Sequence, residues 1–345
     1  MIRSFFTVTR HLAKRVLAVF ALSLGLSPLA LAATPEPSAQ TVYAQALALS
    51  DRLLPLPAWS QSPAFAAFRQ ALLAAPEGLD AAGIALHFNR SQHAAKLGFS
   101  HYALLAPQPD TPAASAPAAP SPAPLPRLSW PRPGVALLSV PSFALDAAQM
   151  LPAAQALAAA RPEAMIIDLR GNAGGALPAA ASLLGLLAPA PVDAGVFLSR
   201  RWYGQGRSEP DAAALAQMPA LATLDLAALS QALQTTGVAR LRIPASPAGG
   251  FRGRLLVLID GHTASTSEPV AWLLRQALGA RLIGQHTAGA MLSSEALPLA
   301  GGYRLRLPVA DYLTPNGQRL DGHGVQPDLP VPPEQALQIA LETLG

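Results

Sequence analysis

The stretch L-L-V-L-I-D-G-H-T-A-S-T-S-E, residues 255–268, decides the fold class and the candidate chemistry of this chain. Its apolar run over 255–259 predicts a buried strand, and the Asp260–Gly261 step ends that strand. The pattern from Pro269 to Leu278 predicts a helix. Between them lies a strand-to-helix turn, where free backbone N–H groups and the helix dipole favour negative charge.

A serine at such a turn has two possible roles. Acyl-transfer enzymes place a nucleophilic hydroxyl beside backbone N–H groups that stabilise an oxyanion. Ser265-x-x-Glu268 is also a capping box, in which the two side chains satisfy N–H groups at the helix start. Taken alone, the stretch favours the capping role, and the rest of the chain has to decide between the two.

The surrounding sequence alternates between strand-like and helix-like patterns. Strands are predicted over 134–140, 164–169, 196–198 and 281–284, helices over 145–160, 177–187 and 333–344, a helical insert over 199–245, and a hairpin from 302–308 with 310–313. This alternation indicates an α/β core with a largely parallel sheet.

Three segments are predicted to precede that core. Residues 1–32 combine a basic start, an apolar run over 16–26 and the small-residue site Ala30-Leu31-Ala32, which is typical of a secretory signal peptide. Residues 41–105 predict two to four short helices and then a strand or turn over 98–105. Residues 107–134 contain ten prolines, so 106–133 is expected to be a linker or surface loop.

The signal peptide predicts export to a bacterial periplasm or to the cell exterior, with an uncleaved membrane anchor as the alternative. The chain has no cysteine, so it has neither a disulfide framework nor a lipidation site. Of its 24 basic residues, four lie in the first 32 positions, and the remainder balance the 20 acidic residues. This balance argues against a nucleic-acid partner.

No nucleotide, metal or other cofactor is expected. The sequence has no P-loop and no G-x-G-x-x-G motif, and its histidines lack the H-E-x-x-H spacing of a zinc site.

Four motifs, most of them rich in glycine, follow one another in the second half of the chain. They are 166–175 (I-I-D-L-R-G-N-A-G-G), the turn at Ser265, 284–289 (G-Q-H-T-A-G) and 320–328 (L-D-G-H-G-V-Q-P-D). Glycines after a buried strand let the backbone approach another segment closely and present its N–H groups. In type and order these motifs resemble the C-terminal processing (tail-specific) serine protease family and its tricorn-core relatives, over about residues 134–344.

The resemblance implies a crotonase-like α/β core over 134–345, joined to the N-terminal helical region. It implies that Ser265 is the nucleophile, with Ser267 as the competing candidate. It also implies an oxyanion hole formed by the backbone N–H of Thr266 and that of Gly174 or Gly175.

The general base differs between the branches of this family. The tail-specific branch uses a Ser–Lys dyad and carries a PDZ domain. This chain has Ala290 at the lysine position and no lysine after Lys96. The Pro-rich stretch 106–133 stands where the PDZ domain would be and is too short to form one. The chain is therefore more similar to the tricorn-core branch.

That branch uses a histidine that follows a serine, and a carboxylate before the G-V-x-P-D motif. The resemblance thus implies His101 as general base, Ser100 as its neighbour in the site, and Asp321, where the branch has Glu, as the orienting acid. His323 and His286 lie in turns that could face the site and remain alternatives for the base, whereas His262 is more typical of a loop residue.

These features together predict an exported serine endopeptidase that acts on peptide or protein substrates through an acyl-enzyme on Ser265. Two alternatives remain open. The same fold occurs in retinoid-binding modules, so a non-catalytic binding or scaffold protein is one. Because the same machinery serves any acyl transfer, hydrolysis of another ester or amide is the other.

Overall fold

The computed structural model describes residues 37–108, 122–247 and 250–345. The chain from Pro37 to Gly345 forms one compact unit. The expected signal peptide and residues 109–121 of the expected linker lie outside the described residues. Within the described ranges, no helix combines the length and the apolar character that a membrane crossing requires.

A six-stranded sheet forms the centre of the core, with the strand order β11-β8-β7-β4-β3-β2. The strands are β2 (Arg127–Arg132), β3 (Val135–Ser139), β4 (Ala164–Asp168), β7 (Arg254–Ile259), β8 (Arg281–Gly284) and β11 (Leu329–Pro330). The five strands from β11 to β3 are parallel, and β2 adds an antiparallel edge. Parallel strands that are buried on both faces read as continuous apolar runs, as 255–259 does.

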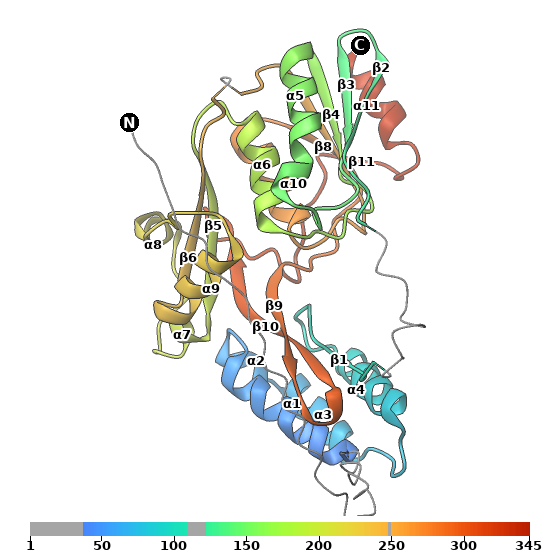
Figure 1. Cartoon of the computed structure of the whole chain (residues 1–345), viewed down its shortest axis with the longest axis vertical. Coiled ribbons are helices and arrows are strands. Elements are labelled where there is room, and N and C mark those ends of the chain that lie inside the picture. The colour runs from blue at the N-terminus through green and yellow to red at the C-terminus, as the bar shows by residue number, and fades with distance from the viewer. Residues whose placement is uncertain (1–36, 109–121, 248–249) are drawn as a thin grey trace, which may run out of the picture. The chain divides into compact units, whose positions relative to one another are not determined.

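Helices cover both faces of this sheet (Figure 1). On one face lie α5 (Leu151–Ala160), preceded by a 3-10 turn at Ala147–Met150, α6 (Leu177–Leu187) and α10 (Ser267–Leu278). The C-terminal helix α11 (Ala336–Leu344) packs against the other face, beside Ile166 and Leu258. The predicted α/β class is therefore confirmed.

A second sheet of five strands carries the order β1-β10-β5-β6, with β9 also paired to β10. Its strands are β1 (Ala103–Leu105), β5 (Val192–Ser199), β6 (Val238–Ile243), β9 (Leu292–Pro298) and β10 (Arg304–Leu313). The insert adds the helices α7 (Arg200–Tyr203), α8 (Ala212–Gln217) and α9 (Leu226–Thr235). The insert therefore contains a strand, β6, besides the expected helices.

The predicted hairpin from 302–308 with 310–313 is wrong. Both segments belong to the single strand β10, whose true hairpin partner is β9. The pairing register shifts between Pro308 and Ala310, so Val309 is the extra residue of a bulge. A bulge interrupts the alternating pattern in the same way as a turn does, which explains the error. The short 3-10 turn Ala300–Gly302 closes the real hairpin.

Residues 39–95 form four helices, the upper end of the two to four that the sequence predicts: α1 (Ala39–Leu53), α2 (Pro57–Ser60), α3 (Pro63–Leu73) and α4 (Ala81–Ala95). Figure 1 shows them around the lower part of β9 and β10. Their aromatic side chains, including Phe65, Phe68 and Phe88, share a core with Leu305 and Leu307 of β10. Because β1 pairs with β10, this packing places the residues just before β1 beside a strand that continues into the core.

The last part of the expected linker is not a loop, because residues 127–132 form β2 and pair with β3. Pro131 lies in that strand, and an edge strand tolerates proline where no ladder bond needs its N–H. The proline content, which predicted a linker, is thus compatible with an edge strand.

Candidate active site

Ser265 sits in the turn between β7 and α10, and its backbone adopts a positive φ of 56°. A non-glycine residue in this region is strained and is often found at a functional site. The Ser265 N–H donates a 3.1 Å hydrogen bond to Glu268 Oε1. The Ser265 Oγ, however, makes no hydrogen bond within the described residues. Only the glutamate half of the expected capping box is present, and the serine hydroxyl is free to react.

The side chain of Glu268 stabilises the Ser265 turn through hydrogen bonds. It is fully buried, and its two oxygens accept hydrogen bonds from the Thr287 hydroxyl and from three backbone N–H groups, those of Ser265, Gly289 and Ala290. Burial raises the pKa of Glu268, and these four hydrogen bonds oppose that rise. One carboxyl group therefore joins the Ser265 turn to the 287–290 loop.

A hydrogen-bonded relay connects His101 to Asp321. The Ser100 hydroxyl donates a 2.5 Å hydrogen bond to Asp321 Oδ1 and lies 2.7 Å from His101 Nδ1. Asp321 also accepts from the backbone N–H groups of Ser100 and Met291. Because the single hydroxyl proton of Ser100 points to the carboxylate, Nδ1 of His101 must carry the hydrogen, which leaves Nε2 as a base.

His101 and Ser265 line the same cavity, of about 250 Å³. Burial lowers the pKa of His101, and the positive charge of Arg306 lowers it further. The imidazole is therefore neutral at neutral pH and can accept a proton. The relay and the shared cavity bring together four of the residues selected from the sequence, Ser100, His101, Ser265 and Asp321, which come from three separate segments of the chain.

Of the two glycines expected as alternative donors to an oxyanion, Gly174 is not free to contribute. Its N–H donates a 2.9 Å hydrogen bond to the side chain of Asn172. Within the described residues the N–H groups of Gly175 and Thr266 have no acceptor, and both residues line the cavity beside Ser265. Gly175 and Thr266 therefore remain the candidate donors, and Gly174 does not.

Gly174 is nevertheless required for a steric reason. A Cβ atom added at Gly174 would lie 2.7 Å from the Ser265 Cβ and 2.9 Å from the Thr266 nitrogen. The glycine loop thus packs directly against the turn that carries Ser265.

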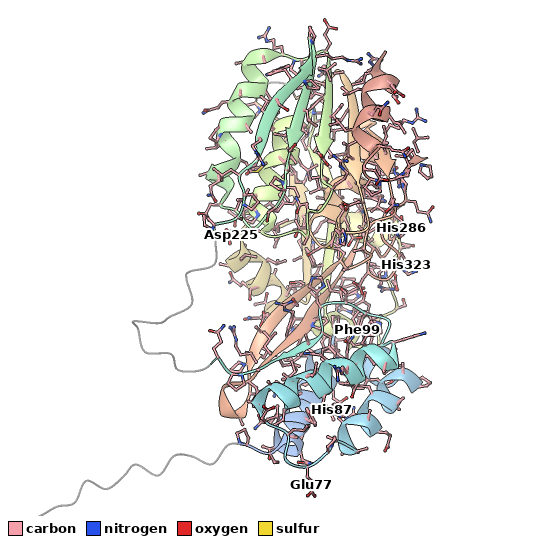
Figure 2. The ribbon with its side chains drawn as sticks, turned by 90° about the vertical axis from the view of Figure 1, so that its right-hand side faces the viewer. Glu77, His87, Phe99, Asp225, His286 and His323 are labelled. Carbon is pink, nitrogen blue, oxygen red and sulfur yellow. The ribbon has the colours of Figure 1, made fainter. Side chains whose placement is uncertain are left out.

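The alternative residues do not reach the cavity. Ser267 is fully buried in the first turn of α10, and its Oγ has no partner in the described part of the chain. His286 and His323 each bind a carbonyl oxygen of their own loop and are exposed. Figure 2 shows them close together above Phe99. His262 is also exposed and does not line the cavity.

Much of the cavity lining is apolar. The apolar residues lie on α6, α9, α10 and the second sheet, and one directly precedes β9: Leu177, Leu184, Phe197, Leu229, Leu241, Val270 and Met291. Such a lining suits an apolar side chain. Across residues 37–108, 122–247 and 250–345, no group of three or more His, Cys, Asp or Glu side chains is placed to hold a metal ion.

Residues 134–331 match peptidase family S41. This match covers more than half of the chain, so the chain belongs to that family. The resemblance identified from the motifs is thereby confirmed.

Two curated relatives share a shorter stretch with the chain. One is a carboxy-terminal-processing protease of Bartonella bacilliformis, 39% identical over 77 residues, or 22% of this chain and 18% of the relative. The other is the chloroplastic carboxyl-terminal-processing peptidase 1 of Arabidopsis thaliana, 35% identical over 74 residues, or 21% of this chain and 15% of the relative. The matched part therefore spans less than a fifth of either relative.

Solved structures support the fold over most of the chain. A lipoprotein from Streptococcus agalactiae superposes with a TM-score of 0.55 at 15% identity, covering 94% of this chain and 99% of that one. The photosystem II D1 C-terminal processing protease gives a TM-score of 0.53 at 16% identity, covering 86% and 94%. The expected processing-protease fold is thus confirmed.

Proposed function

We propose that this chain is a serine peptidase that cleaves peptide bonds through an acyl-enzyme on Ser265. The observation that carries the proposal is the shared cavity of Ser265 and His101, with His101 held by the Ser100–Asp321 relay. A non-catalytic binding module has no need for a free serine hydroxyl, an oriented base and two unpaired N–H groups in one cavity.

In the proposed reaction, Nε2 of His101 takes the proton of Ser265 as Oγ attacks the substrate carbonyl carbon. The N–H groups of Gly175 and Thr266 donate hydrogen bonds to the resulting oxyanion. His101 then returns the proton to the leaving amine, and the C–N bond breaks. Water, deprotonated by the same ring, hydrolyses the acyl-enzyme and regenerates Ser265.

The apolar part of the cavity adjoins Ser265 and Thr266 and would receive the side chain before the scissile bond. The whole cavity has a volume of about 250 Å³, which suits one aliphatic or aromatic side chain. The proposed substrates are therefore peptides or proteins with an apolar residue at that position. For location, the proposal follows the signal-like start at 1–32 and places the protein outside the cytoplasm, in a periplasm or beyond the cell.

Labelling with a fluorophosphonate probe, followed by peptide mapping, tests this proposal. We expect the label on Ser265, its loss in Ser265→Ala and His101→Ala, and its retention in Ser267→Ala, the matched control two residues away. Circular dichroism verifies that each variant is folded. A folded wild-type protein that takes no label would favour the binding-module alternative. Cleavage of esters but not of peptides would instead favour a different acyl substrate.

A further inference from the structure

A second cavity adjoins the relay from the side of Ser100 and Asp321. It has a volume of about 650 Å³ and lies between the N-terminal helical region and two loops of the core. Ser100 and Asp321 line it, whereas their relay partner His101 lines the cavity that contains Ser265. The relay therefore connects two cavities, and the proposed reaction uses only one of them.

The lining of the second cavity is predominantly basic. Among the described residues, Asp321 is its one acidic lining residue. That carboxylate is buried and accepts hydrogen bonds from Ser100 and from the Met291 N–H. The lining residues that carry or can acquire a positive charge are His93, Lys96, Arg319 and His323. The cavity therefore favours an anionic ligand.

Lys96 is the cation most available to such a ligand. Arg319 is already paired with Asp311 and Glu209. The Lys96 side chain, in contrast, makes no hydrogen bond or ion pair with any residue that the structure describes. Its ammonium group can therefore bind a ligand in the cavity without first breaking another contact.

Two stacked aromatic rings form the main apolar part of this lining. The ring centroids of Trp59 and Phe99 lie 4.8 Å apart, with 14° between the ring planes, and both residues line the cavity. His323 lines it from above Phe99 in the view of Figure 2. Ligand sites commonly combine aromatic walls with a few polar groups. This combination suits a small ligand that has an aromatic body and an anionic group.

One wall of the second cavity continues directly into the proposed base. Residues 96–100 line the cavity, and His101 follows them. Lys96, Gly98 and His101 all have positive φ values. Non-glycine residues in this region persist only where the surrounding contacts hold them. A ligand that contacts this segment therefore acts on the position of His101.

Another wall supports Ser265. Gly289 and Ala290 line the cavity, and their N–H groups donate to Glu268. Glu268 also accepts from the Ser265 N–H. The second cavity thus borders the supports of both the base and the nucleophile. A ligand changes an equilibrium at another site only through such differential contacts.

We propose that this second cavity binds a small organic anion with an aromatic body, and that its occupancy favours the protonated form of His101. The negative charge stabilises the imidazolium and offsets the opposing charge of Arg306. Binding is independent of the proposed peptidase function, whereas the effect on catalysis rests on it.

Other groups near His101 also respond to pH, and they decide which measurement is informative. Asp321 and Arg306 act on the ring, and the cavity adds the charged or titratable residues His93, Lys96, Arg319 and His323. His93 and His323 can gain protons and attract the anion themselves. The pH dependence of affinity therefore does not isolate His101, and its ring has to be observed directly.

Calorimetry with four probes tests the ligand class. Benzoate and phenylphosphonate carry a ring and a negative charge, benzamide is the neutral analogue of benzoate, and acetate lacks the ring. We expect saturable binding of the two aromatic anions, at least about fivefold tighter than that of benzamide or acetate. The tighter of the two identifies the preferred anionic group. Equal binding of benzoate and benzamide would overturn the anionic class, and equal binding of benzoate and acetate would overturn the aromatic requirement.

Two variants test the location of the site. Lys96→Gln should weaken benzoate binding about fivefold. Arg90→Gln is the matched control, because Arg90 is a cation of α4 that does not line the cavity. Both variants should keep the kcat/KM of the protein without ligand, and circular dichroism verifies that they are folded. Equal weakening in both, or in neither, would overturn the assignment to this cavity.

NMR of the His101 ring nitrogens tests the coupling, in pH titrations with and without saturating benzoate. We expect the midpoint to move to higher pH by roughly 0.3 of a pH unit, as one charge about 10 Å away produces in water. The acid limb of kcat/KM should move in the same direction. An unchanged midpoint despite binding would overturn the coupling. If the folded protein takes no serine label and cleaves no peptide, the peptidase function fails, whereas calorimetry and NMR still decide this inference.

Discussion

The hydroxyl of Thr266 donates a 2.8 Å hydrogen bond to the carbonyl oxygen of Gly175. It joins the two residues whose N–H groups form the proposed oxyanion hole, and so it fixes the spacing between them. Thr266→Val removes this bond at nearly constant volume, and we expect kcat to fall about tenfold with little change in KM. Thr266→Ser keeps the hydroxyl and should keep most of kcat. Steady-state kinetics of the two variants provide the comparison, and equal losses in both would argue against this role.

Alanine variants of Gly171 and Gly174 separate the cost of a steric clash from the cost of backbone strain. Both have positive φ values, but a Cβ at Gly171 meets nothing within 4 Å, whereas one at Gly174 meets the Ser265 turn. Gly174→Ala should therefore abolish serine labelling and destabilise the protein by roughly 1–3 kcal/mol. Gly171→Ala should cost about 1 kcal/mol of backbone strain and keep labelling. Thermal unfolding and labelling measured together would show whether the variants differ in this way.

In the proposed reaction Ser100 has a positioning role, because its hydroxyl lies between Asp321 and His101. Ser100→Ala should lower kcat/KM by about a hundredfold, since the ring loses the partner that fixes its tautomer. Asp321→Asn should have a similar effect, and the double variant should be little worse than either single one. NMR of the imidazole nitrogens would report the tautomer directly. Additive losses in the double variant would contradict a single relay.

Activity should persist below the usual pKa of histidine. The proposed reaction needs neutral His101, and burial together with the charge of Arg306 lowers the pKa of this residue from 6.5. The acid limb of kcat/KM against pH should therefore lie below pH 6.5. The same shift makes the free energy of unfolding depend on pH. Below pH 6.5 the unfolded chain binds a proton at His101 more readily than the folded protein does, so the free energy of unfolding decreases as the pH falls. A pH–rate profile with its acid limb above 6.5 would contradict this assignment.

Glu268 is expected to stabilise the turn that carries Ser265. Glu268→Gln places an amide donor against groups that themselves donate, so at least one hydrogen bond is lost in a buried site, at a cost of about 1–3 kcal/mol. Glu77→Gln is the control, because Figure 2 shows Glu77 at the outer end of the N-terminal region. Chemical denaturation of both variants measures the difference. A neutral effect of Glu268→Gln would mean that the 287–290 loop holds the turn without it.

The core could be predicted from sequence because its parallel strands and helices carry strong local patterns. The strands β9 and β2 could not. β9 (L-S-S-E-A-L-P) has neither a continuous apolar run nor clear alternation, and it becomes a strand only through pairing with β10. β2 contains Pro131. Proline usually indicates a break in a strand, but a strand at the edge of a sheet tolerates it.

The candidate site could also be predicted only in part, because some of its features arise only in the folded chain. The motifs identified Ser265, Ser100, His101 and Asp321, but the positive φ values of Ser265 and His101 depend on the folded turn and leave no mark in the sequence. The choice between Gly174 and Gly175 had a usable signal. Asn172 lies two residues before Gly174, and asparagine side chains commonly accept from a backbone N–H two residues on. That pattern would have excluded Gly174 in advance.

The relay joins residues that are 221 positions apart, since Ser100 and Asp321 come from opposite ends of the described chain. A chain made from its N-terminus contains His101 and Ser265 long before Asp321 and the whole of β10 exist. Until β10 forms, the three-residue strand β1 has no partner and His101 no fixed position. We therefore expect the proposed peptide-cutting capacity to begin only when β10 and the Asp321 turn have folded, which would protect the unfolded segments of a newly made chain from its own site.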